Sequence, residues 1–402
     1  MKDESILNTI IADNQIKDLS GFDVTQAVEA LLEQLNIREQ DVLKRRFGLL
    51  NEAQETLESI GQRHKLTRER IRQIESGGVN KIKKSTELEA RLGRLRQIVS
   101  QLTEEHGGLM SKRYLFSVLD SLAKAQGETN ANLEPYFEFV LSRLFNDHFD
   151  EINNSKYFNS FYKLKYQDLN HLEIVAQELI GEIKNLKKLM ATDGLINTVK
   201  KLKSYETHAD KFITPNNFEV KDILSSALPD YSDLIHDNRV VYSLLEAMSD
   251  IEKNKFGNWG HREWREITPK TINDKIYLVL KENGQPMYYG DIAKRISEMG
   301  FDVKKVNTAT THNELILDDK YVLVGRGLYG LKEWGYKEGT VADVIEGILL
   351  EAGEPLSKEE INKLVTGQRL VKQTTVNLAL MNKNRFERTR EGKYKIKENK
   401  ID

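Results

Sequence analysis

Residues 56–84 constrain the fold more than any other segment of this 402-residue chain. Apolar residues recur along the segment three and four positions apart, which is the spacing of one face of an α-helix. Near its middle, Thr67 offers a hydroxyl that can accept a hydrogen bond from a free backbone N–H and so begin a second helix. The apolar positions are Leu57, Ile60, Leu66, Ile71, Ile74, Val79 and Ile82. This pattern predicts two helices joined by a tight turn, a helix-turn-helix.

The second predicted helix carries side chains that can read DNA bases. Those on its outer face, opposite Ile71 and Ile74, are Arg68, Glu69, Arg72 and Gln73. Arginine can bind guanine through two hydrogen bonds, glutamine can bind adenine, and glutamate can accept a hydrogen bond from cytosine. Near the N-terminus of the second helix, these are the residue types of a major-groove reader. The alternative is an ordinary solvated helix with mixed charges.

Residues 22–84 resemble region 4 of bacterial primary sigma factors. The resemblance is carried by residues 38–49 (REQDVLKRRFGL), 56–61 (TLESIG) and 67–75 (TRERIRQIE). In that family, region 4 recognises the promoter −35 element and touches the flap of the RNA polymerase β subunit. The resemblance therefore implies that double-stranded promoter DNA is read by Arg68, Glu69, Arg72 and Gln73. The residues expected on the DNA backbone are Thr67, Arg70, Lys81 and Lys84.

Two features depart from the family pattern. Lys65 occupies the predicted turn, where a left-handed backbone costs an ordinary residue about 1 kcal/mol. Gly77 and Gly78 follow the base-reading residues, and each glycine weakens a helix by about 1 kcal/mol relative to alanine. We therefore expect the recognition helix to end or bend at these glycines. The chain also has no counterpart of the sigma region that melts and holds the −10 element, so we expect a regulator and not a complete sigma factor.

Positive charge is concentrated in two segments of a chain that is otherwise near neutral. The net charge is −2, yet residues 62–96 hold eleven Lys or Arg against four Glu, and residues 369–400 hold ten against three. Such patches are the expected footprint of separate modules that contact phosphates. The alternative, mainly for the C-terminal patch, is a set of lysines that only keep the surface soluble.

The C-terminal third contains an internal repeat. Residues 276–296 and 344–365 share a helical pattern that is interrupted by a Gly-x-Pro turn. Each copy continues into a third helical segment and closes on a hairpin, in which Gly327 matches Gly392 and Tyr329 matches Tyr394. The third segments span about 306–316 and 374–382, and the hairpins span 321–331 and 386–396. Three helices and an alternating hairpin with glycine at its turn predict a winged helix.

Residues 268–334 resemble HARE-type helix-turn-helix domains, including the N-terminal domain of the RNA polymerase delta subunit. The resemblance is carried by Ile272, Leu278, Leu280, Pro286, Ile292, Ile296, residues 325–327 and residues 329–331. It implies a module that binds duplex nucleic acid or docks on polymerase-associated partners, with the third helix toward the groove and the wing on phosphates. The candidates are Lys304, Lys305, His312 and Arg326 in the first copy and Lys372, Gln373, Asn377, Arg388 and Arg390 in the second. The alternative is that about half of these positions are simply solvated.

The predicted fold class is mostly α: a multi-domain array of helix-turn-helix and winged-helix modules with small β-hairpin wings. We expect a helical lead (1–21), the helix-turn-helix (22–87), a helical region that a divergent winged helix would fit (88–168), a helical middle region (169–265) and two winged helices (266–335 and 338–398). Trp259, Trp264 and Trp334 bracket the first winged helix, and we expect them to pack across its base. A stacking platform for unpaired bases is the alternative.

Composition and motifs argue against several classes of function. The chain has no cysteine, which excludes disulfides, thiol catalysis and cysteine-ligated zinc. No stretch approaches the roughly 18 apolar residues of a membrane span, and the N-terminus does not read as a signal peptide, so we expect a cytoplasmic protein without a membrane partner. The eight histidines show no metal-ligand spacing, and no hydrolase or nucleotide-binding motif is present. We expect no metal, no cofactor and no catalysis. A nuclease is the enzymatic alternative, because HARE-type domains also occur attached to restriction enzymes.

Together these features predict a sequence-specific DNA-binding transcription regulator that acts at bacterial promoters. The helix-turn-helix would read a −35-like element, and the winged helices would add phosphate contacts and therefore avidity. RNA polymerase core, through its β flap, is the expected protein partner. The alternative is a polymerase-docking accessory protein whose DNA binding is non-specific.

Overall fold

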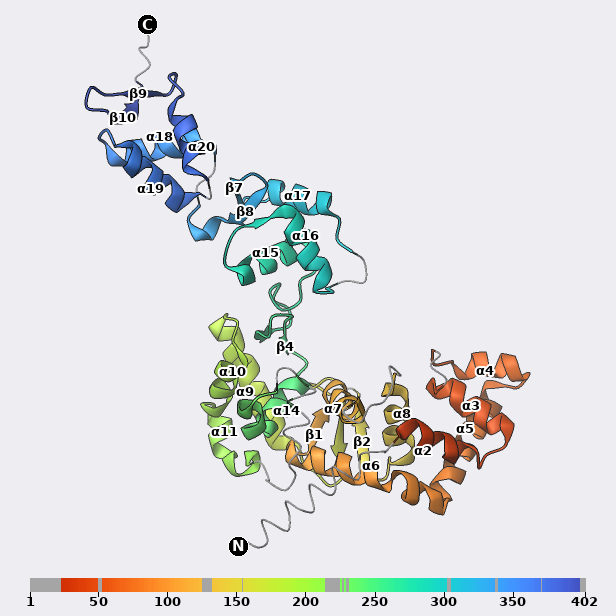
Figure 1. The fold of residues 1–402 in the computed structure, drawn as a ribbon. Helices are drawn as coiled ribbons and strands as arrows, with labels where there is room; N and C mark the ends of the chain where they lie inside the picture. The colour runs from red at the N-terminus through yellow and green to blue at the C-terminus, as the bar shows by residue number, and fades with distance from the viewer. Residues whose placement is uncertain are drawn as a thin grey trace. The chain divides into compact units, whose positions relative to one another are not determined.

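The computed structural model describes residues 23–49, 53–124, 132–153, 155–213, 225, 228, 231–301, 305–336, 339–369 and 371–397. Most of these residues lie in helices, and the strands form only small antiparallel sheets, which confirms the predicted mostly-α class (Figure 1). The chain divides into two compact units, Met1–Lys253 with Gly257–Arg262 and Asn254–Phe256 with Glu263–Asp402. The helical lead predicted over residues 1–21 lies outside the described residues.

The first described helices form a helix-turn-helix body. They are α2 (Val24–Leu32), α3 (Ile37–Phe47), α4 (Leu57–His64) and α5 (Arg68–Lys84). Val42 of α3, Ile60 of α4 and Ile71 of α5 pack together and are fully buried. Thr67 is the N-cap of α5, where its hydroxyl accepts a hydrogen bond from the Arg70 N–H at 3.2 Å. The predicted pair of helices and the predicted cap are therefore confirmed.

The expectation that the recognition helix ends or bends at Gly77 and Gly78 is wrong, because α5 continues without a break to Lys84. Gly78 lies on the buried face of α5, where a Cβ atom would approach Leu43 Cδ1 at 3.1 Å and Leu35 Cδ1 at 3.5 Å. Close packing of α5 on the preceding helices therefore outweighs the low helix propensity of glycine.

The recognition helix leads directly into the next body of the fold. Ser85 alone separates α5 from α6, because it is the C-cap of the first helix and the N-cap of the second. The elements that follow are α6 (Thr86–Glu105), β1 (Leu109–Ser111), α7 (Lys112–Lys124), α8 (Glu134–Phe139), η1 (Val140–Leu144), β2 (Phe149–Ile152) and β3 (Phe161–Leu164). The sheet order is β1-β3-β2, so the last strand lies between the other two. We call residues 86–164 the first module.

A second module with the same order of elements follows within the first unit. Its elements are α9 (Asn170–Leu186), α10 (Thr192–Lys200), α11 (Lys203–Thr207), η2 (Ala209–Phe212), α13 (Asp233–Asp237), α14 (Arg239–Ala247), β4 (Ile251–Lys253) and β5 (Trp259–His261). Its first strand is reduced to Met190, whose N–H and carbonyl both pair with Trp259, at 2.9 and 2.7 Å. The residues predicted as a helical middle region (169–265) thus hold a small sheet as well.

The second unit contains two more copies. The third module comprises α15 (Ile272–Asn283), β6 (Met287–Tyr288), α16 (Tyr289–Glu298), α17 (Thr308–Leu317), β7 (Tyr321–Gly325) and β8 (Leu328–Leu331), followed by η3 (Lys332–Trp334). The fourth comprises α18 (Val341–Ala352), α19 (Lys358–Gln368), α20 (Gln373–Leu380), β9 (Phe386–Arg388) and β10 (Tyr394–Ile396). The three helices and hairpin predicted for each of these segments are present, and α15 and α18 begin with equivalent capping boxes, Thr271 with Asp274 and Thr340 with Asp343.

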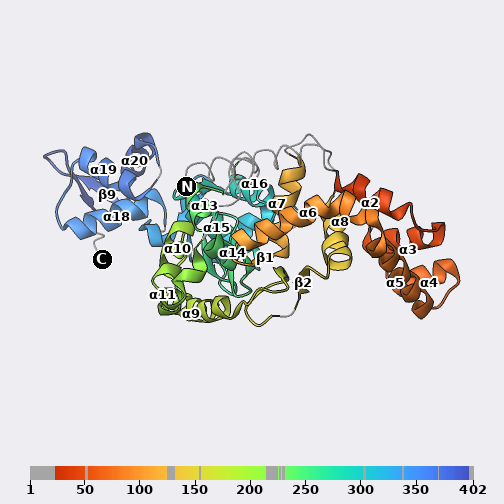
Figure 2. The ribbon, with the colours of Figure 1, turned by 90° about the horizontal axis from the view of Figure 1, so that it is seen from below.

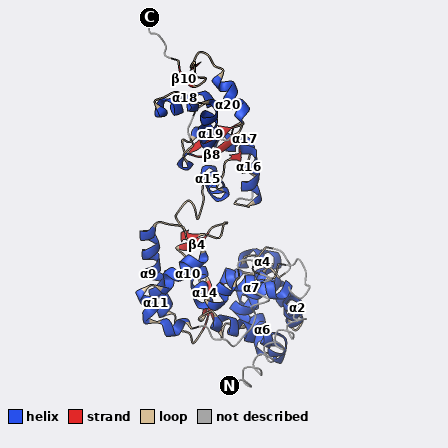
Figure 3. Ribbon diagram, turned by 60° about the vertical axis from the view of Figure 1, so that its left-hand side comes forward, coloured by secondary structure: helices blue, strands red, loops and turns tan. Residues whose placement is uncertain are grey.

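All four modules share one strand pairing, and their strands are the short red segments among blue helices in Figure 3. In every module the strand directly before the second helix pairs antiparallel with the last strand of the hairpin. The paired residues include Met110 with Tyr162, Met190 with Trp259, Met287 with Tyr329 and Leu356 with Tyr394. A methionine or leucine opposite an aromatic residue therefore marks the same position four times.

The expectation that three tryptophans pack across the base of the third module is wrong for Trp259. This residue belongs to the first unit, where it is 1% exposed and donates its indole N–H to Thr192 Oγ1 at 3.0 Å. Its ring lies edge-on to Tyr242, with centroids 6.2 Å apart. Trp334, in contrast, packs against the core of the third module as expected.

We expect Trp259→Ala to lower the free energy of unfolding of the first unit by about 3–5 kcal/mol, because the change removes a large, fully buried ring and leaves a cavity. Denaturant unfolding followed by circular dichroism measures the loss. Leu186→Ala, at a position of the same module that is 46% exposed, serves as the control and should cost much less. Equal losses in the two variants would contradict the central position of Trp259.

Candidate nucleic-acid interface

The turn between α4 and α5 depends on two residues. Lys65 follows the end of α4 with φ 57° and ψ 40°, the left-handed conformation that the sequence predicted for this position. The N–H of Leu66 then donates to the carbonyl of Gly61 at 2.9 Å. A Cβ atom on Gly61 would lie 2.8 Å from the Leu66 carbonyl oxygen, so only glycine allows the two backbones to approach this closely. This approach sets the angle at which α5 leaves α4.

The side chains predicted to read bases lie on the exposed side of the first turns of α5. Arg68, Glu69, Arg72 and Gln73 are all exposed, whereas Ile71 beneath them is fully buried. The structure therefore brings the four predicted residues together on one surface. The N-cap at Thr67 fixes where this surface begins.

Two hydrogen-bonded pairs of residues organise these side chains. Arg72 donates from Nε and Nη2 to the two carboxylate oxygens of Glu69 at 2.9 and 2.7 Å, and both side chains are 58% exposed. Arg70 donates from Nη1 to Gln73 Oε1 at 3.1 Å. The hydrogen bonds from Arg72 lower the pKa of Glu69, and Glu69 raises the pKa of Arg72. Both groups therefore stay charged, and the exposed pair can open toward a base at little cost.

The exposed face of α5 extends further than the sequence indicated. Ser76 and Asn80 are exposed and continue the spacing of three and four residues that starts at Glu69 and Gln73. The sequence analysis did not include them, because it expected the helix to end or bend at Gly77 and Gly78. Their helical spacing from Gln73 was the signal that could have identified them.

The two lysines predicted to contact the DNA backbone have different environments. Lys84 is exposed at the end of α5. Lys81 donates to Glu39 Oε1 at 2.6 Å, and Glu39 also completes the capping box of α3 with Asn36. The hydrogen bond from Lys81 is the largest influence on the pKa of Glu39, which is lowered. Lys81 thus ties α5 to α3, a role that the sequence did not indicate.

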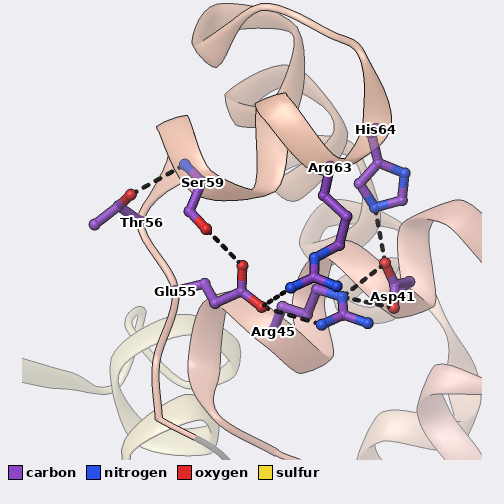
Figure 4. Close-up of polar contacts among 7 residues, drawn as sticks. All are labelled: Asp41, Arg45, Glu55, Thr56, Ser59, Arg63 and His64. Carbon is purple, nitrogen blue, oxygen red and sulfur yellow. Dashed lines mark hydrogen bonds and ion pairs between the residues drawn. The ribbon is translucent and has the colours of Figure 1, made fainter.

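A polar network joins α3, α4 and the loop between them (Figure 4). Asp41 of α3 accepts hydrogen bonds from Arg45 Nε at 2.9 and 3.0 Å, and its Oδ2 lies 2.7 Å from His64 Nε2 at the end of α4. Glu55 in the loop accepts from Arg45 Nη1 at 3.0 Å and from Ser59 Oγ at 2.8 Å. The network therefore fixes α4 on α3, and with it the helix that positions α5.

The back of the helix-turn-helix is covered by the first module, as Figure 2 shows for α2 and α8. Phe47 of α3 packs on Phe139 with ring centroids 4.8 Å apart, and the Arg143 guanidinium lies 5.5 Å above the Phe47 ring. The hydroxyl of Tyr136 donates to the carbonyl of Leu49. This apolar face is thus buried inside the first unit, whereas the outer face of α5 is exposed.

The third helices of the first two modules are buried. In the first module, α8 and η1 carry six buried apolar residues and contact α2, α3 and α5. In the second, nearly all of α14 is buried and packs on β1 and α7, where Ser243 Oγ donates to the Leu109 carbonyl at 2.5 Å. Arg239 of α14 also lies 3.5 Å from Glu105 of α6, and both are buried. Neither third helix can enter a DNA groove in this arrangement.

The DNA-contact candidates predicted for the two winged helices differ in their exposure and in their contacts. Lys304 lies outside the described residues, whereas Lys305, Arg326, Lys372, Gln373 and Arg390 are exposed. His312 stacks on Tyr289 with centroids 4.4 Å apart and lies 3.2 Å from the Tyr329 hydroxyl, so it contributes to packing. Asn377 accepts from Asn362 Nδ2 at 3.2 Å, and Arg388 donates from Nε to the Gly392 carbonyl at 3.2 Å.

Neither a metal-site cluster nor a membrane-spanning helix occurs in the part of the chain that the structure describes. No group of three or more His, Asp or Glu residues there has the arrangement of a metal site. None of the described helices is both long and apolar enough to cross a membrane.

Comparison with known proteins supports the first body of the fold. Residues 31–84 match the family model of sigma-70 region 4. The chain is 44% identical over 71 residues to the RNA polymerase sigma factor RpoD of Helicobacter pylori, covering 17% of this chain and 11% of that protein. It is 38% identical over 88 residues to the RNA polymerase sigma factor SigA of Lactococcus lactis subsp. cremoris, covering 20% and 24%. No solved structure matches the chain.

The matched segment is thus less than a quarter of either sigma factor and about a fifth of this chain. A region 4 domain implies DNA binding and a role in transcription by RNA polymerase. The resemblance of residues 268–334 to HARE-type domains stays a prediction.

We expect Gly61→Ala to lower the free energy of unfolding by about 1–3 kcal/mol, because its methyl group would be forced against the Leu66 carbonyl. The same change should weaken DNA binding, since α5 would shift. Thermal unfolding and duplex binding measure the two effects. Gly77→Ala is the matched control: nothing lies within 4 Å of its Cβ position, so it should stabilise α5 by up to about 1 kcal/mol. A loss of stability in both variants would contradict this account of the turn.

The Asp41 network predicts a dependence of stability on pH. Burial raises the pKa of Asp41, but the hydrogen bonds from Arg45 and His64 outweigh it, and the net pKa is lower than the usual 3.8. Its stabilising contribution is therefore present above the unfolded-state pKa and is lost as the pH falls through the lower folded-state value. We expect Asp41→Asn to cost about 1 kcal/mol at neutral pH, with the difference from wild type shrinking as the pH falls below the usual pKa of 3.8 and vanishing only below the lower folded-state pKa. A difference that stays constant through this range, measured by denaturant unfolding, would contradict the assignment.

Proposed function

We propose that this protein is a transcription regulator that binds promoter DNA and recognises a −35-like element through α5. The observation that carries this proposal is the exposed, N-capped first half of α5, where Arg68, Glu69, Arg72 and Gln73 form one surface within residues that match sigma-70 region 4. Residues of these types at the start of a recognition helix can hydrogen-bond to base edges in the major groove.

In this proposal, recognition begins with the opening of the Glu69–Arg72 pair. Arg72 exchanges its two hydrogen bonds to Glu69 for two to the O6 and N7 atoms of a guanine, and Glu69 becomes available to accept a hydrogen bond from a cytosine. Gln73 is released from Arg70 in the same way and can bind an adenine. Thr67 at the start of α5, and Arg70 and Lys84 within it, then contact the DNA backbone. The protein acts by occupying the promoter, and no covalent bond is made or broken.

RNA polymerase core is the protein partner that we propose, on the strength of the region 4 match. The face of the helix-turn-helix made by Phe47 and Leu49 is already covered by Phe139 and Tyr136. Polymerase, by its β flap or another surface, would therefore have to bind an exposed part of the chain. The covered face favours DNA reading over the alternative in which the helix-turn-helix serves only as a docking piece.

We also propose that the third and fourth modules are winged helices, the third of HARE type. Their element order of three helices and a hairpin, with the last strand paired to the strand before the second helix, supports this proposal. We propose no catalytic role for the chain. The enzymatic alternative is a nuclease, and magnesium-dependent cleavage of plasmid DNA by the purified protein would establish it.

We expect Arg72→Ala and Gln73→Ala each to reduce the preference for a duplex with a −35-like hexamer over a scrambled duplex by about 1–3 kcal/mol. The physical reason is the loss of hydrogen bonds to base edges. Fluorescence anisotropy with both duplexes across a salt series measures the preference. Lys84→Ala is the control, because a phosphate contact should weaken binding to both duplexes alike.

The docking alternative makes the opposite prediction for the same variants. If the helix-turn-helix only docks on polymerase, wild type will bind both duplexes equally, and Arg72→Ala will change neither. A pull-down with core polymerase would then retain the wild-type level of association in the variant. That pair of results would overturn base reading by α5.

A further inference from the structure

The four modules share a topology but differ in what their third helix can contact. Those of the first and second modules are buried inside the first unit, as described above. Those of the third and fourth modules, α17 and α20, are exposed along one side. Of the four third helices, only these two have an exposed side that a ligand outside the chain could contact.

The third module lacks the charge that DNA binding requires. Its α17 carries no Lys or Arg and one acidic residue, Glu314, and it exposes Ile316 and Leu317. His312 is occupied in packing between Tyr289 and Tyr329. Residues 272–334 hold nine Lys or Arg against nine Asp or Glu, so the module carries no net positive charge. Its exposed cations among the described residues are Lys281, Lys294, Arg295, Lys305, Lys320, Arg326 and Lys332.

The fourth module separates its charges along the chain. Residues 339–362, which include α18 and the start of α19, hold six acidic residues and one Lys. Residues 363–397, which include α20 and the hairpin, hold ten Lys or Arg and two Glu. Seven of these cations are exposed: Lys363, Lys372, Lys383, Arg388, Arg390, Lys393 and Lys397. We call these seven exposed cations the basic surface of the module, and such a concentration of positive charge favours a polyanionic ligand.

The geometry of the hairpin supports the same ligand. Its turn is closed by hydrogen bonds from Thr389 N–H to the Lys393 carbonyl at 2.8 Å and from Gly392 N–H to the Thr389 carbonyl at 3.0 Å. This rigid turn holds Arg390 and Lys393 together at the tip, next to Arg388. At the end of the hairpin opposite the turn, Lys397 Nζ lies 3.4 Å from the Lys383 carbonyl, so these two lysines lie close together.

The exposed side of α20 suits a DNA surface because it is uncharged and polar at its start. Gln373, Thr374 and Thr375 are exposed there, directly after Lys372. Such side chains can hydrogen-bond to phosphate oxygens without repelling them. Leu378 and Met381 further along α20 are 70% and 72% exposed. Their substitution is used in the test below to distinguish a DNA ligand from a protein ligand.

We propose that the fourth module is a second DNA-binding site, which holds duplex DNA through the hairpin β9–β10 and α20 without regard to base sequence. The third module does not share this activity. The proposal does not depend on base reading by α5, because it concerns contacts to phosphates. One chain would then contact DNA at two sites in different units, one that selects a sequence and one that adds affinity.

The test uses the full chain, a duplex with a −35-like hexamer and a scrambled duplex, in a salt series. Arg390→Ala combined with Lys393→Ala should weaken binding to both duplexes by roughly tenfold or more near 0.1 M salt, and reduce the slope of log affinity against log salt by about two. Lys305→Ala combined with Arg326→Ala is the matched control from the third module and should leave both quantities unchanged. Thermal unfolding verifies that both double variants fold.

The outcomes separate this proposal from the proposed function. Loss of sequence preference in Arg72→Ala concerns α5 alone, whereas a change in salt slope in the hairpin variant concerns the fourth module alone. An unchanged slope in the hairpin variant would overturn the second site. If that variant instead lost binding to polyglutamate, and Leu378→Ala with Met381→Ala lost it too, the basic surface would be assigned to an acidic protein and not to DNA.

Discussion

The packing of Phe47 on Phe139 is the contact on which the arrangement of the first unit depends. It buries the back of the helix-turn-helix under α8 and η1, and Tyr136 and Arg143 complete the same interface. A helix with apolar residues on more than one side needs more than one neighbour to bury them. The third helix of the first module meets this need by lying between its own module and the helix-turn-helix. The exposed face of α5 is what remains for a ligand.

The repeated module shows how one topology can serve two purposes. Where the third helix is rich in buried aromatic and aliphatic residues, as in α8, η1 and α14, it joins neighbouring bodies into one unit. Where it has only two buried residues, as in α17 and α20, one side of it stays at the surface. The difference lies in the side chains of the third helix and not in the strand pairing, which is the same in all four copies.

Local features of the sequence were predictable, and features that depend on distant packing were not. The cap at Thr67, the left-handed Lys65 and the exposed Arg68 to Gln73 follow from residues near one another in the chain. The straight course of α5 through Gly78 depends on Leu35 and Leu43, which lie more than thirty positions away. The sheet of the second module was missed because its first strand is only Met190 and because a long segment separates α10 from α14. The Lys81–Glu39 bond likewise joins residues 42 positions apart.

The single residue between α5 and α6 has a mechanical consequence. Ser85 caps both helices, so the two are joined without a flexible linker. The 17 residues of α5 make a rod of about 25 Å at 1.5 Å per residue, with Arg68 at its far end. Because the helix is this long, a rotation of one degree about Ser85 would move its far end by about 0.4 Å. A small change in the angle at Ser85 would therefore produce a larger displacement at Arg68 and the side chains next to it.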